Sequence, residues 1–378
     1  MKHRILFTAS TFSHIVNFHR PYLQAFRDLG WEVVVACGGR EMDIPEADRL
    51  VVIPFEKSIT SPKNANAVLH LRKLLQADRY DLISCHTALA AFFTRLAVFG
   101  MKNRPAIACT AHGYLFDADT TGLRGRLLRG AEQLTAPVTD VLMTMNRWDS
   151  EYALSHRLGK TIVEIPGMGV NFPAMRPVSQ TEAQQLREQL ELSPEDILMV
   201  YAAEFSTRKS QMILLQALPS LPERVKLLLP GDGALREACI AFCRDNGLSH
   251  RVRFPGQVRD MPLWYAAADI AVSSSRSEGL PFNIMEAMHF ALPIVASAVK
   301  GHTDLIRPEE TGLLFPYGDS DAFAAQIRRL LEEKDLAGTL GRQAAQAVQA
   351  YSLPEVFPVV MGVYQQYLLP APAESPVP

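Results

Sequence analysis

Two glutamates, a glycine and a proline give one stretch of this sequence its clearest chemistry. From Ser273 to Met288 the chain runs S-S-S-R-S-E-G-L-P-F-N-I-M-E-A-M, directly after an apolar segment typical of a strand. Pro281 suits the first turn of a helix, where a missing N–H costs nothing. Amides at the start of a helix lack intrahelical partners, so Gly279 and Leu280 are predicted to line an anion site.

Glu278 and Glu286 enclose seven residues and bracket the start of this helix. A carboxylate is poorly suited to binding phosphate itself, but it accepts hydrogen bonds from hydroxyl groups. The pattern therefore favours sugar hydroxyls beside a phosphate site. The alternative is a solvated helix that carries two unrelated glutamates.

A second loop adds positive charge. The segment A-E-F-S-T-R-K-S-Q follows a predicted strand, Leu198–Ala202, and contains Arg208 and Lys209. Two cations beside a helix-terminus anion site suit a diphosphate leaving group, although a solvated loop could carry the same residues. Gly231 and Gly233 lie between a predicted strand and a helix, where a tight turn and a ligand contact are equally good explanations.

Four histidines lie where predicted strands end or helices begin. His112 follows the predicted strand Ala106–Thr110 and precedes a glycine, which favours a position in a cleft. His14, His19 and His86 are expected to face the same cleft. Each of the four can act in chemistry near neutral pH or serve as a structural hydrogen-bond partner.

A basic helix is predicted over residues 123–136. Arg124, Arg126 and Arg129 alternate there with leucines. Such a surface can rest on anionic lipid at the inner face of a membrane, and it can equally be a solvated basic face.

These residues need a scaffold of alternating strands and helices. Short apolar segments alternate with helical ones through residues 5–165 and again through 198–350, a rhythm typical of parallel sheets covered on both faces. We predict an α/β fold of two Rossmann-like, doubly wound domains with a ligand cleft between them. The expected parts are an N-terminal domain (1–170), a linker (171–190), a C-terminal domain (191–350) and a C-terminal helix (351–370).

Composition excludes several classes of protein. The formal net charge of the 378 residues is -2, so nucleic acid is not an expected partner. The five cysteines form no C-x-x-C pair and are expected to be buried thiols. No apolar stretch approaches the roughly 20 residues that span a bilayer, and the N-terminus suits a first strand better than a signal peptide. We expect a cytoplasmic protein.

The motif E-G-x-P followed by E-A-M after a strand resembles the signature of family-four glycosyltransferases, which have the two-lobed GT-B fold. The segments S-H-I-V-N-F-H-R-P-Y-L at 13–23 and T-A-H-G-Y at 110–114 resemble the bacterial exopolysaccharide and capsule subgroup. The resemblance covers nearly the whole chain. It implies that the last helix crosses back to the N-terminal domain, which would explain why residues 351–369 are so apolar.

The resemblance also implies roles for the residues above. Glu278 would hold the sugar hydroxyls of a nucleotide-sugar donor, and Glu286 the ribose. The diphosphate would lie against the Gly279 and Leu280 amides beside Lys209, which matches the family's lysine. The family's usual Gly-Arg is Glu204-Phe205 here, so Arg208 is the substitute. The other implied donor contacts are Gly231, Gly233, Val258, Arg259 and Pro281.

On the acceptor side the resemblance implies His14, His19, His86 and Tyr114, with His112 near the reacting bond. His112, Glu278 and Lys209 are the expected catalytic residues. No D-x-D motif lies in a suitable loop, since Asp117-Ala118-Asp119 follows no strand directly. We therefore expect no metal ion and no other cofactor.

The implied activity is a retaining transfer of a hexosyl or N-acetylhexosaminyl group, most simply from a UDP-sugar, to a glycan or lipid-linked acceptor. A nucleotide-sugar 2-epimerase on the same fold is one alternative, and a bilobal sugar-binding protein without catalytic activity is another. A dehydrogenase is disfavoured, because residues 10–14 occupy the turn where G-x-G-x-x-G would follow the first strand.

Overall fold

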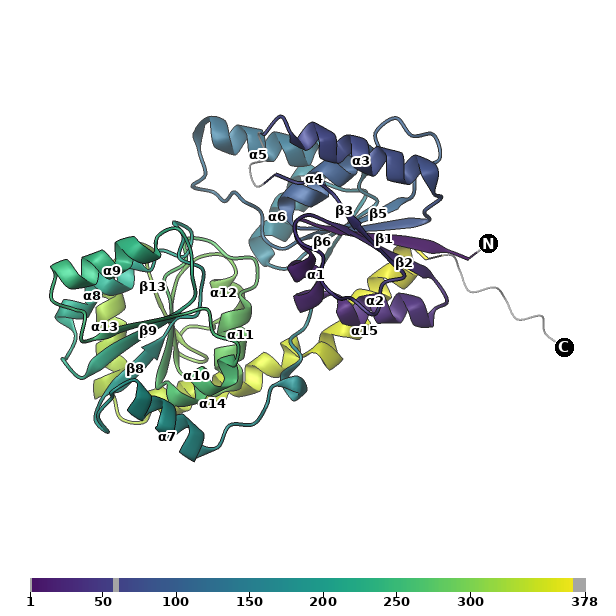
Figure 1. Cartoon of the computed structure of the whole chain (residues 1–378). Coiled ribbons are helices and arrows are strands. Elements are labelled where there is room, and N and C mark those ends of the chain that lie inside the picture. The colour runs from purple at the N-terminus through teal and green to yellow at the C-terminus, as the bar shows by residue number, and fades with distance from the viewer. Residues whose placement is uncertain (1, 57–60, 370–378) are drawn as a thin grey trace. The chain divides into compact units, whose positions relative to one another are not determined.

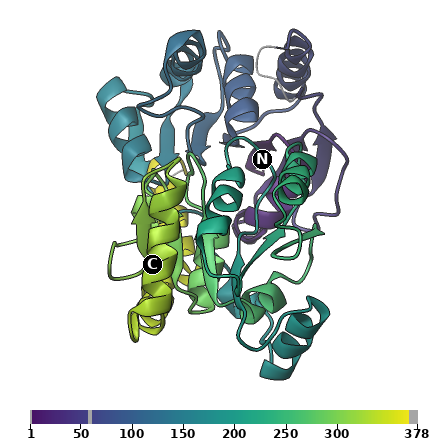
Figure 2. The same ribbon diagram turned by 90° about the vertical axis from the view of Figure 1, so that its left-hand side faces the viewer.

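The computed structural model describes residues 2–56 and 61–369. The chain divides into two compact units, one of Met1–Gly169 with Pro354–Pro378 and one of Val170–Leu353. Each unit is a parallel sheet with helices on both faces (Figure 1, Figure 2). The predicted α/β fold with two doubly wound, Rossmann-like domains is confirmed.

The first unit contains a seven-stranded sheet of order β3-β2-β1-β4-β5-β6-β7. Its strands are β1 (Arg4–Ala9), β2 (Glu32–Cys37), β3 (Arg49–Val52), β4 (Leu82–His86), β5 (Ala106–Ala111), β6 (Val141–Thr144) and β7 (Thr161–Glu164). Its helices are α1 (Phe12–Phe18), α2 (Arg20–Asp28), α3 (Asn64–Ala77), α4 (Ala88–Ala97), α5 (Gly122–Thr135), α6 (Arg147–His156) and, from Pro354 onward, α15 (Leu353–Tyr367).

The second unit contains a six-stranded sheet of order β10-β9-β8-β11-β12-β13. Its strands are β8 (Ile197–Val200), β9 (Val225–Pro230), β10 (Val252–Gly256), β11 (Ile270–Ser273), β12 (Ile294–Ser297) and β13 (Leu313–Phe315). Its helices are α7 (Gln180–Gln189), α8 (Met212–Ala217), α9 (Arg236–Asp245), α10 (Met261–Ala267), α11 (Phe282–His289), α12 (His302–Leu305), α13 (Ser320–Glu332) and α14 (Leu336–Ala347).

Both sheets reverse their strand order once, between β1 and β4 and between β8 and β11. The loops that leave the carboxyl ends of two such strands run to opposite faces of the sheet and leave a crevice between them. Each unit therefore has one place where the topology itself favours a ligand site.

Two segments differ from the prediction. The expected linker, 171–190, contains helix α7, which begins at a capping box between Ser179 and Glu182. Ala183 and Leu186 on this helix pack against Ala267, so α7 is part of the second unit. The turn predicted over residues 10–14 is shorter than expected: helix α1 begins at Phe12, because Phe12 and Ile15 are apolar and bury against the sheet.

Helix α15 supplies apolar surface to the first unit. Tyr364 is buried, its ring packs edge-on against Phe26 with centroids 5.2 Å apart, and its hydroxyl lies 2.6 Å from Ser84 Oγ. Phe357 packs against Tyr22. Pro358 lies inside the helix.

Candidate functional site

The second unit gathers charged side chains at the carboxyl ends of β8 and β11. The loop after β8 carries Arg208 and Lys209, and the loop after β11 carries Glu278. Lys209 Nζ lies 2.5 Å from Glu278 Oε1, and Arg208 Nη1 lies 2.7 Å from Glu278 Oε2. Two separate loops thus contribute three residues to one ionic cluster at the reversal of the strand order.

Glu278 is the buried centre of this cluster, with 8% of its surface exposed. Ser275 Oγ donates a third hydrogen bond to Oε1 at 2.6 Å. Burial raises the pKa of Glu278, but the charges of Lys209 and Arg208 outweigh this effect and bring the pKa to about 2. The side chain is therefore a carboxylate at neutral pH, and both of its oxygens already accept hydrogen bonds.

Lys209 is more deeply buried than Arg208. The Lys209 carbonyl accepts hydrogen bonds from the Tyr201 hydroxyl and from Ser274 Oγ, each at 3.1 Å. Burial lowers the pKa of the Lys209 ammonium, and the Glu278 carboxylate opposes that effect. The side chain of Lys209 is 12% exposed and that of Arg208 is 46% exposed. Arg208 Nη1 also donates to the Ser277 carbonyl at 3.1 Å, so both cations are hydrogen-bonded, and Arg208 is the more exposed of the two.

Gly301 and His302 lie beside Glu278, and neither residue was predicted from the sequence. Gly301 has φ +84°, and a Cβ there would lie 2.8 Å from Glu278 Cβ. His302 is fully buried, with Nε2 3.0 Å from Ser273 Oγ and Nδ1 2.8 Å from the Ser297 carbonyl. A Gly-His pair shortly after an apolar strand is the signal that could have indicated this position.

Glu286 lies on α11, and the Tyr265 hydroxyl donates to its Oε2 at 3.0 Å. Burial raises the pKa of Glu286 to about 7, and the tyrosine hydroxyl only partly opposes this shift. The side chain therefore changes its protonation state near neutral pH. Pro281 takes the N-cap position of α11, one residue before the predicted first turn, and Leu280 before it is buried.

The two glycines of Gly231-Asp232-Gly233 make room for backbone. A Cβ at Gly231 would lie 2.1 Å from the Ala203 carbonyl oxygen, and one at Gly233 would lie 2.5 Å from that of Phe205. These glycines thus support the loop that carries the two cations, which favours the structural alternative for both.

The predicted base-binding residues lie in the loop between β10 and α10. Val258 is half-buried there and Arg259 is exposed. Their assignment as donor contacts remains a prediction.

In the first unit the four histidines come together at the carboxyl ends of β1, β4 and β5. The rings of His14 and His112 lie 4.6 Å apart edge-on, and those of His19 and His86 stack at 3.8 Å. His112 Nε2 lies 3.3 Å from His86 Nδ1. Burial lowers the pKa of all four, that of His14 to about 4, so the cluster is uncharged at neutral pH.

Tyr114 does not join this cluster. Its ring stacks on Phe116 with centroids 4.9 Å apart and belongs to the hydrophobic core. Gly113 has φ +103°, which turns the chain after His112 and directs the next side chain inward. The predicted acceptor contact at Tyr114 is therefore wrong, because its side chain packs in the core.

Helix α5 shows the predicted basic face only in part. Arg124 and Arg126 are exposed. Arg129, predicted to belong to the same basic face, is half-buried and points back to the protein. It donates to the carbonyls of Thr120 and Asp117 at 2.9 and 2.8 Å, and its guanidinium lies over the Phe116 ring. The helix also exposes three large apolar side chains: Leu123, Leu127 and Leu134.

Two further observations complete the description. All five cysteines are buried and unpaired, as predicted. Within residues 2–56 and 61–369, no helix is both long enough and apolar enough to cross a membrane.

Comparison with known proteins assigns both halves of the chain. Residues 22–166 match the family model described as Glycosyltransferase Family 4, and residues 196–333 match the one described as Glycosyl transferases group 1. EpsD of Bacillus subtilis (strain 168) is 32% identical over 373 residues, which cover 97% of this chain and 98% of that protein.

Two more distant proteins are also similar. The UDP-Gal:alpha-D-GlcNAc-diphosphoundecaprenol alpha-1,3-galactosyltransferase of Escherichia coli is 23% identical over 289 residues, 74% of each chain. The crystal structure of Anabaena Alr3699/HepE in complex with UDP-glucose has a TM-score of 0.80 at 21% identity, and it covers 95% of this chain and 98% of that one. The latter similarity shows a shared fold.

Proposed function

The chain belongs to the glycosyltransferases that combine a Glycosyltransferase Family 4 domain with a Glycosyl transferases group 1 domain, and we propose that it transfers a hexosyl or N-acetylhexosaminyl group from a UDP-sugar with retention at the anomeric carbon. The proposed acceptor is a glycan or lipid-linked sugar in surface polysaccharide synthesis. The cluster of Glu278, Lys209 and Arg208 carries this proposal. Two observations on similar proteins support the substrates: the HepE complex contains UDP-glucose, and the name of the E. coli relative specifies UDP-Gal and a diphosphoundecaprenol acceptor.

In the proposed reaction the bond between the anomeric carbon and the diphosphate breaks, and its electron pair goes to a phosphate oxygen. The acceptor hydroxyl oxygen bonds to the same face of that carbon, and its proton passes to the departing phosphate. Negative charge develops on the diphosphate during this step. Lys209 offers a fixed positive charge there, and Arg208 can swing from Glu278 toward the phosphate.

Glu278 can hold a sugar hydroxyl even before Arg208 moves away from it. A carboxylate has about four lone-pair sites. Lys209, Arg208 and Ser275 use three of them. One acceptor site remains for a donor-sugar hydroxyl, so the structure is compatible with the role that the sequence predicts.

The proposal is tested by thermal-shift screening of the full chain against a panel of nucleotides and nucleotide sugars. A ligand at 100 times its Kd stabilises the native state by about 2.7 kcal/mol. We expect the largest shift with UDP or a UDP-sugar. Product analysis with and without acceptor then separates transfer from epimerisation, because an epimerase consumes its donor without acceptor. Shifts confined to other nucleotides would contradict the choice of UDP.

The pKa of Glu286 predicts a pH-dependent donor affinity. The carboxylate accepts hydrogen bonds from ribose hydroxyls, so donor binding favours its charged form and releases a proton from the neutral one. With a free-state pKa of about 7, affinity for a UDP-sugar should rise about tenfold from pH 6 to pH 8. Isothermal titration calorimetry in buffers of different ionisation enthalpy measures both quantities.

Two variants control this prediction. Glu286→Gln should bind more weakly and show no pH dependence in this range. Tyr265→Phe removes the hydroxyl that lowers the pKa of Glu286, so the rise in affinity should move to higher pH. A wild-type affinity that is flat between pH 6 and pH 8 would contradict the assignment of Glu286 to the ribose.

We also predict that transfer needs no added divalent metal, because Arg208, Lys209 and the amides at the start of α11 balance the diphosphate charge. Initial rates with and without excess chelator should agree. A loss of rate that Mg²⁺ or Mn²⁺ restores would show that these groups are insufficient.

Helix α5 is proposed to bring the enzyme to the cytoplasmic membrane surface that carries a lipid-linked acceptor. Arg124 and Arg126 each contribute on the order of 1 kcal/mol at an anionic surface, and the exposed leucines add apolar contact. Changing both arginines to Glu should therefore weaken binding to anionic liposomes by more than about 30-fold. Co-sedimentation at low and high salt measures this, since the attraction is screened over about 10 Å at 0.1 M salt.

Arg224→Glu with Arg342→Glu is the matched control, because both residues are exposed in the second unit and the change in net charge is the same. This control should sediment nearly as the wild type does, and both double variants should bind UDP-sugar normally. Equal loss of sedimentation in both would show that net charge, not α5, determines the association.

A further inference from the structure

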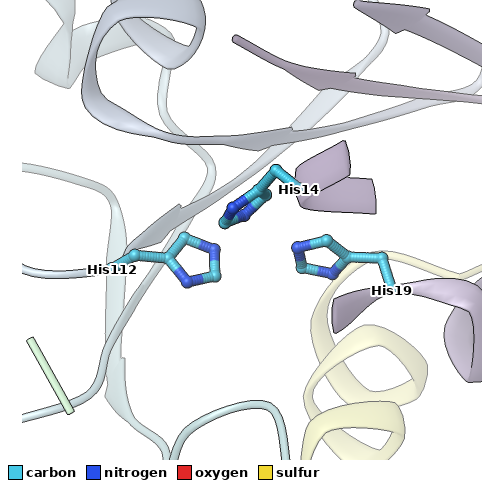
Figure 3. Close-up of side chains that lie close together, drawn as sticks. All are labelled: His14, His19 and His112. Carbon is cyan, nitrogen blue, oxygen red and sulfur yellow. The ribbon is translucent and has the colours of Figure 1, made fainter. Parts of the chain in front are cut away.

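Three histidine rings point toward one another in the first unit (Figure 3). One ring nitrogen from each of His14, His19 and His112 lies within 4.8 Å of the others. His14 lies on α1, His19 at the junction of α1 and α2, and His112 directly after β5. Segments far apart in the chain therefore bring three imidazoles to one point at the carboxyl edge of the sheet.

Three ring nitrogens of His14 and His19 have no hydrogen-bond partner within residues 2–56 and 61–369. His19 is fully buried, and neither of its ring nitrogens has a hydrogen-bond partner among the residues that the structure describes. The same holds within those residues for His14 Nε2. Buried polar groups in native proteins almost always have a partner, so this cluster is better suited to a bound ligand than to a purely structural role.

The chemistry of three converging imidazoles indicates which kind of ligand would bind. A neutral imidazole keeps a lone pair on one ring nitrogen, and His14, His19 and His112 bring one such nitrogen each to the same point. Neutral imidazoles repel no cation, and they are the form in which histidine coordinates metals. Three nitrogen ligands suit late first-row divalent ions such as Zn²⁺, Co²⁺ and Ni²⁺ better than Mg²⁺ or Ca²⁺, which prefer oxygen.

We propose that His14, His19 and His112 form a binding site for a late first-row divalent metal ion, with Zn²⁺ as the reference ion and at least one coordination position left open. Zn–N bonds of about 2.0–2.1 Å in tetrahedral geometry require nitrogens about 3.4 Å apart. Nitrogens up to 4.8 Å apart must therefore approach by up to about 1.4 Å when the ion binds, through rotation about the side-chain bonds.

A second layer of contacts orients one of the ligands. His112 Nε2 lies 3.3 Å from His86 Nδ1, and His86 Nε2 lies 2.9 Å from Ser84 Oγ. A histidine that binds a metal commonly donates its other N–H to an acceptor. If His112 donates from Nε2 to His86, its Nδ1 is the ligand atom, and His86 is a positioning residue.

Metal binding here has a consequence for the reaction that rests on the proposed function. His112 is proposed to lie near the reacting bond. A metal ion would take the lone pair of His112 and occupy the space beside it. Zn²⁺ added to the metal-free enzyme should therefore inhibit transfer, and excess chelator should restore the rate of the metal-free enzyme. The site is one for regulation by metal ions and not a cofactor site.

The experiment uses the full chain without an affinity tag, stripped of metal by a chelator. Co²⁺ is titrated and followed by its visible d–d absorption, Zn²⁺ is titrated in competition, and elemental analysis gives the stoichiometry. We expect one ion per chain and a higher Tm with Zn²⁺. His14→Gln and His19→Phe should each weaken Zn²⁺ binding about 100-fold or more. His156→Gln, at an exposed histidine on α6, is the control and should bind as the wild type does.

His19→Phe separates a ligand from a structural residue. Phenylalanine fills nearly the same space and removes two buried nitrogens without partners, so the metal-free variant should be as stable as the wild type or more stable. Loss of Co²⁺ binding in this stable variant supports the site. Absence of saturable binding by the wild type, or unchanged affinity in both His14→Gln and His19→Phe, would overturn it.

The binding measurement needs neither donor nor acceptor, so it stands even if the proposed activity fails. Stoichiometric Zn²⁺ binding without inhibition of transfer would instead overturn the position of His112 at the reacting bond and leave the metal site intact.

Discussion

Replacing Lys209 with methionine should lower the rate of sugar transfer by about 10²–10³-fold, the usual cost of removing one fixed charge that stabilises a transition state. Methionine keeps most of the side-chain volume but cannot balance the diphosphate. Binding of the free nucleoside should change little, because its contacts lie elsewhere. Initial rates at saturating acceptor, together with calorimetric binding of uridine and UDP, measure the two effects separately.

The same substitution should also destabilise the second unit, for a different reason. Glu278 is 8% exposed, and without Lys209 its carboxylate keeps the cationic partner Arg208, which is itself half-exposed. Breaking a buried ion pair on one side typically costs about 3–5 kcal/mol. Arg208 should reduce this cost, so we expect the lower end of that range, measured by denaturant unfolding.

A double variant separates stability from catalysis. Glu278→Gln alone leaves the buried Lys209 without its counter-charge and should also be destabilising. Lys209→Met combined with Glu278→Gln removes both charges, so it should regain most of the stability but none of the activity. If the double variant transfers sugar at the wild-type rate, the cluster is structural and the proposed function loses its main support.

Acid is expected to remove the contribution that Glu278 makes to the stability of the second unit. The pKa of Glu278 falls from its ordinary value of 4.5 to about 2 in the native state. Its contribution to stability is therefore complete above about pH 4.5 and lost as the pH falls toward 2. Glu278→Gln should lack this part of the acid-induced loss of stability.

The course of the chain through residues 273–288 was predictable because several local sequence signals agreed. An apolar strand, a glycine, a proline and a glutamate within one stretch fix where the helix begins, and the structure places Pro281 at the N-cap. The ion pairs of Glu278 were not predictable, since they depend on two loops that meet only after the sheet forms. The expected role of Glu278 toward a sugar thus has to be reconciled with partners that the sequence does not show.

The errors have local physical causes. Three prolines within residues 166–177 favoured a linker through residue 190, so the helix that starts at Ser179 was not predicted. Its start has the spacing of a capping box between Ser179 and Glu182. Arg129 looked like its neighbours on α5, but Gly125 allows close approach to the Thr120 carbonyl, to which Arg129 donates. Such reversals of side-chain direction depend on backbone geometry and cannot be derived from residue type.

The second large effect is expected from the end of the chain. A chain that ends at Leu353, the last residue of the second unit, lacks the part of α15 that belongs to the first unit. Val356, Val360, Met361 and Val363 are buried on this helix. Each buried apolar side chain contributes about 1.5–3 kcal/mol, so the helix supplies roughly 6–12 kcal/mol, comparable to the whole stability of a domain.

Removal of this helix should therefore leave the first unit unfolded or aggregated rather than merely weakened. Tyr22 and Phe26, now covered by α15, would be exposed. Expression followed by fractionation of soluble and insoluble protein tests this. A chain that ends at Leu369 is the control, because it keeps the entire helix and should remain folded.

A point substitution tests the same contact without deleting any chain. Tyr364→Ala leaves a cavity beside Phe26 and should cost about 3–5 kcal/mol, as large aromatic truncations in cores do. Tyr364→Phe keeps the ring and removes only the hydroxyl that lies 2.6 Å from Ser84 Oγ, so its cost should be about 1 kcal/mol. The truncation has one contradicting outcome. If the chain ending at Leu353 is soluble and its first unit is as stable as in the full chain, the first unit folds without α15. The apolar face of this helix then serves another purpose.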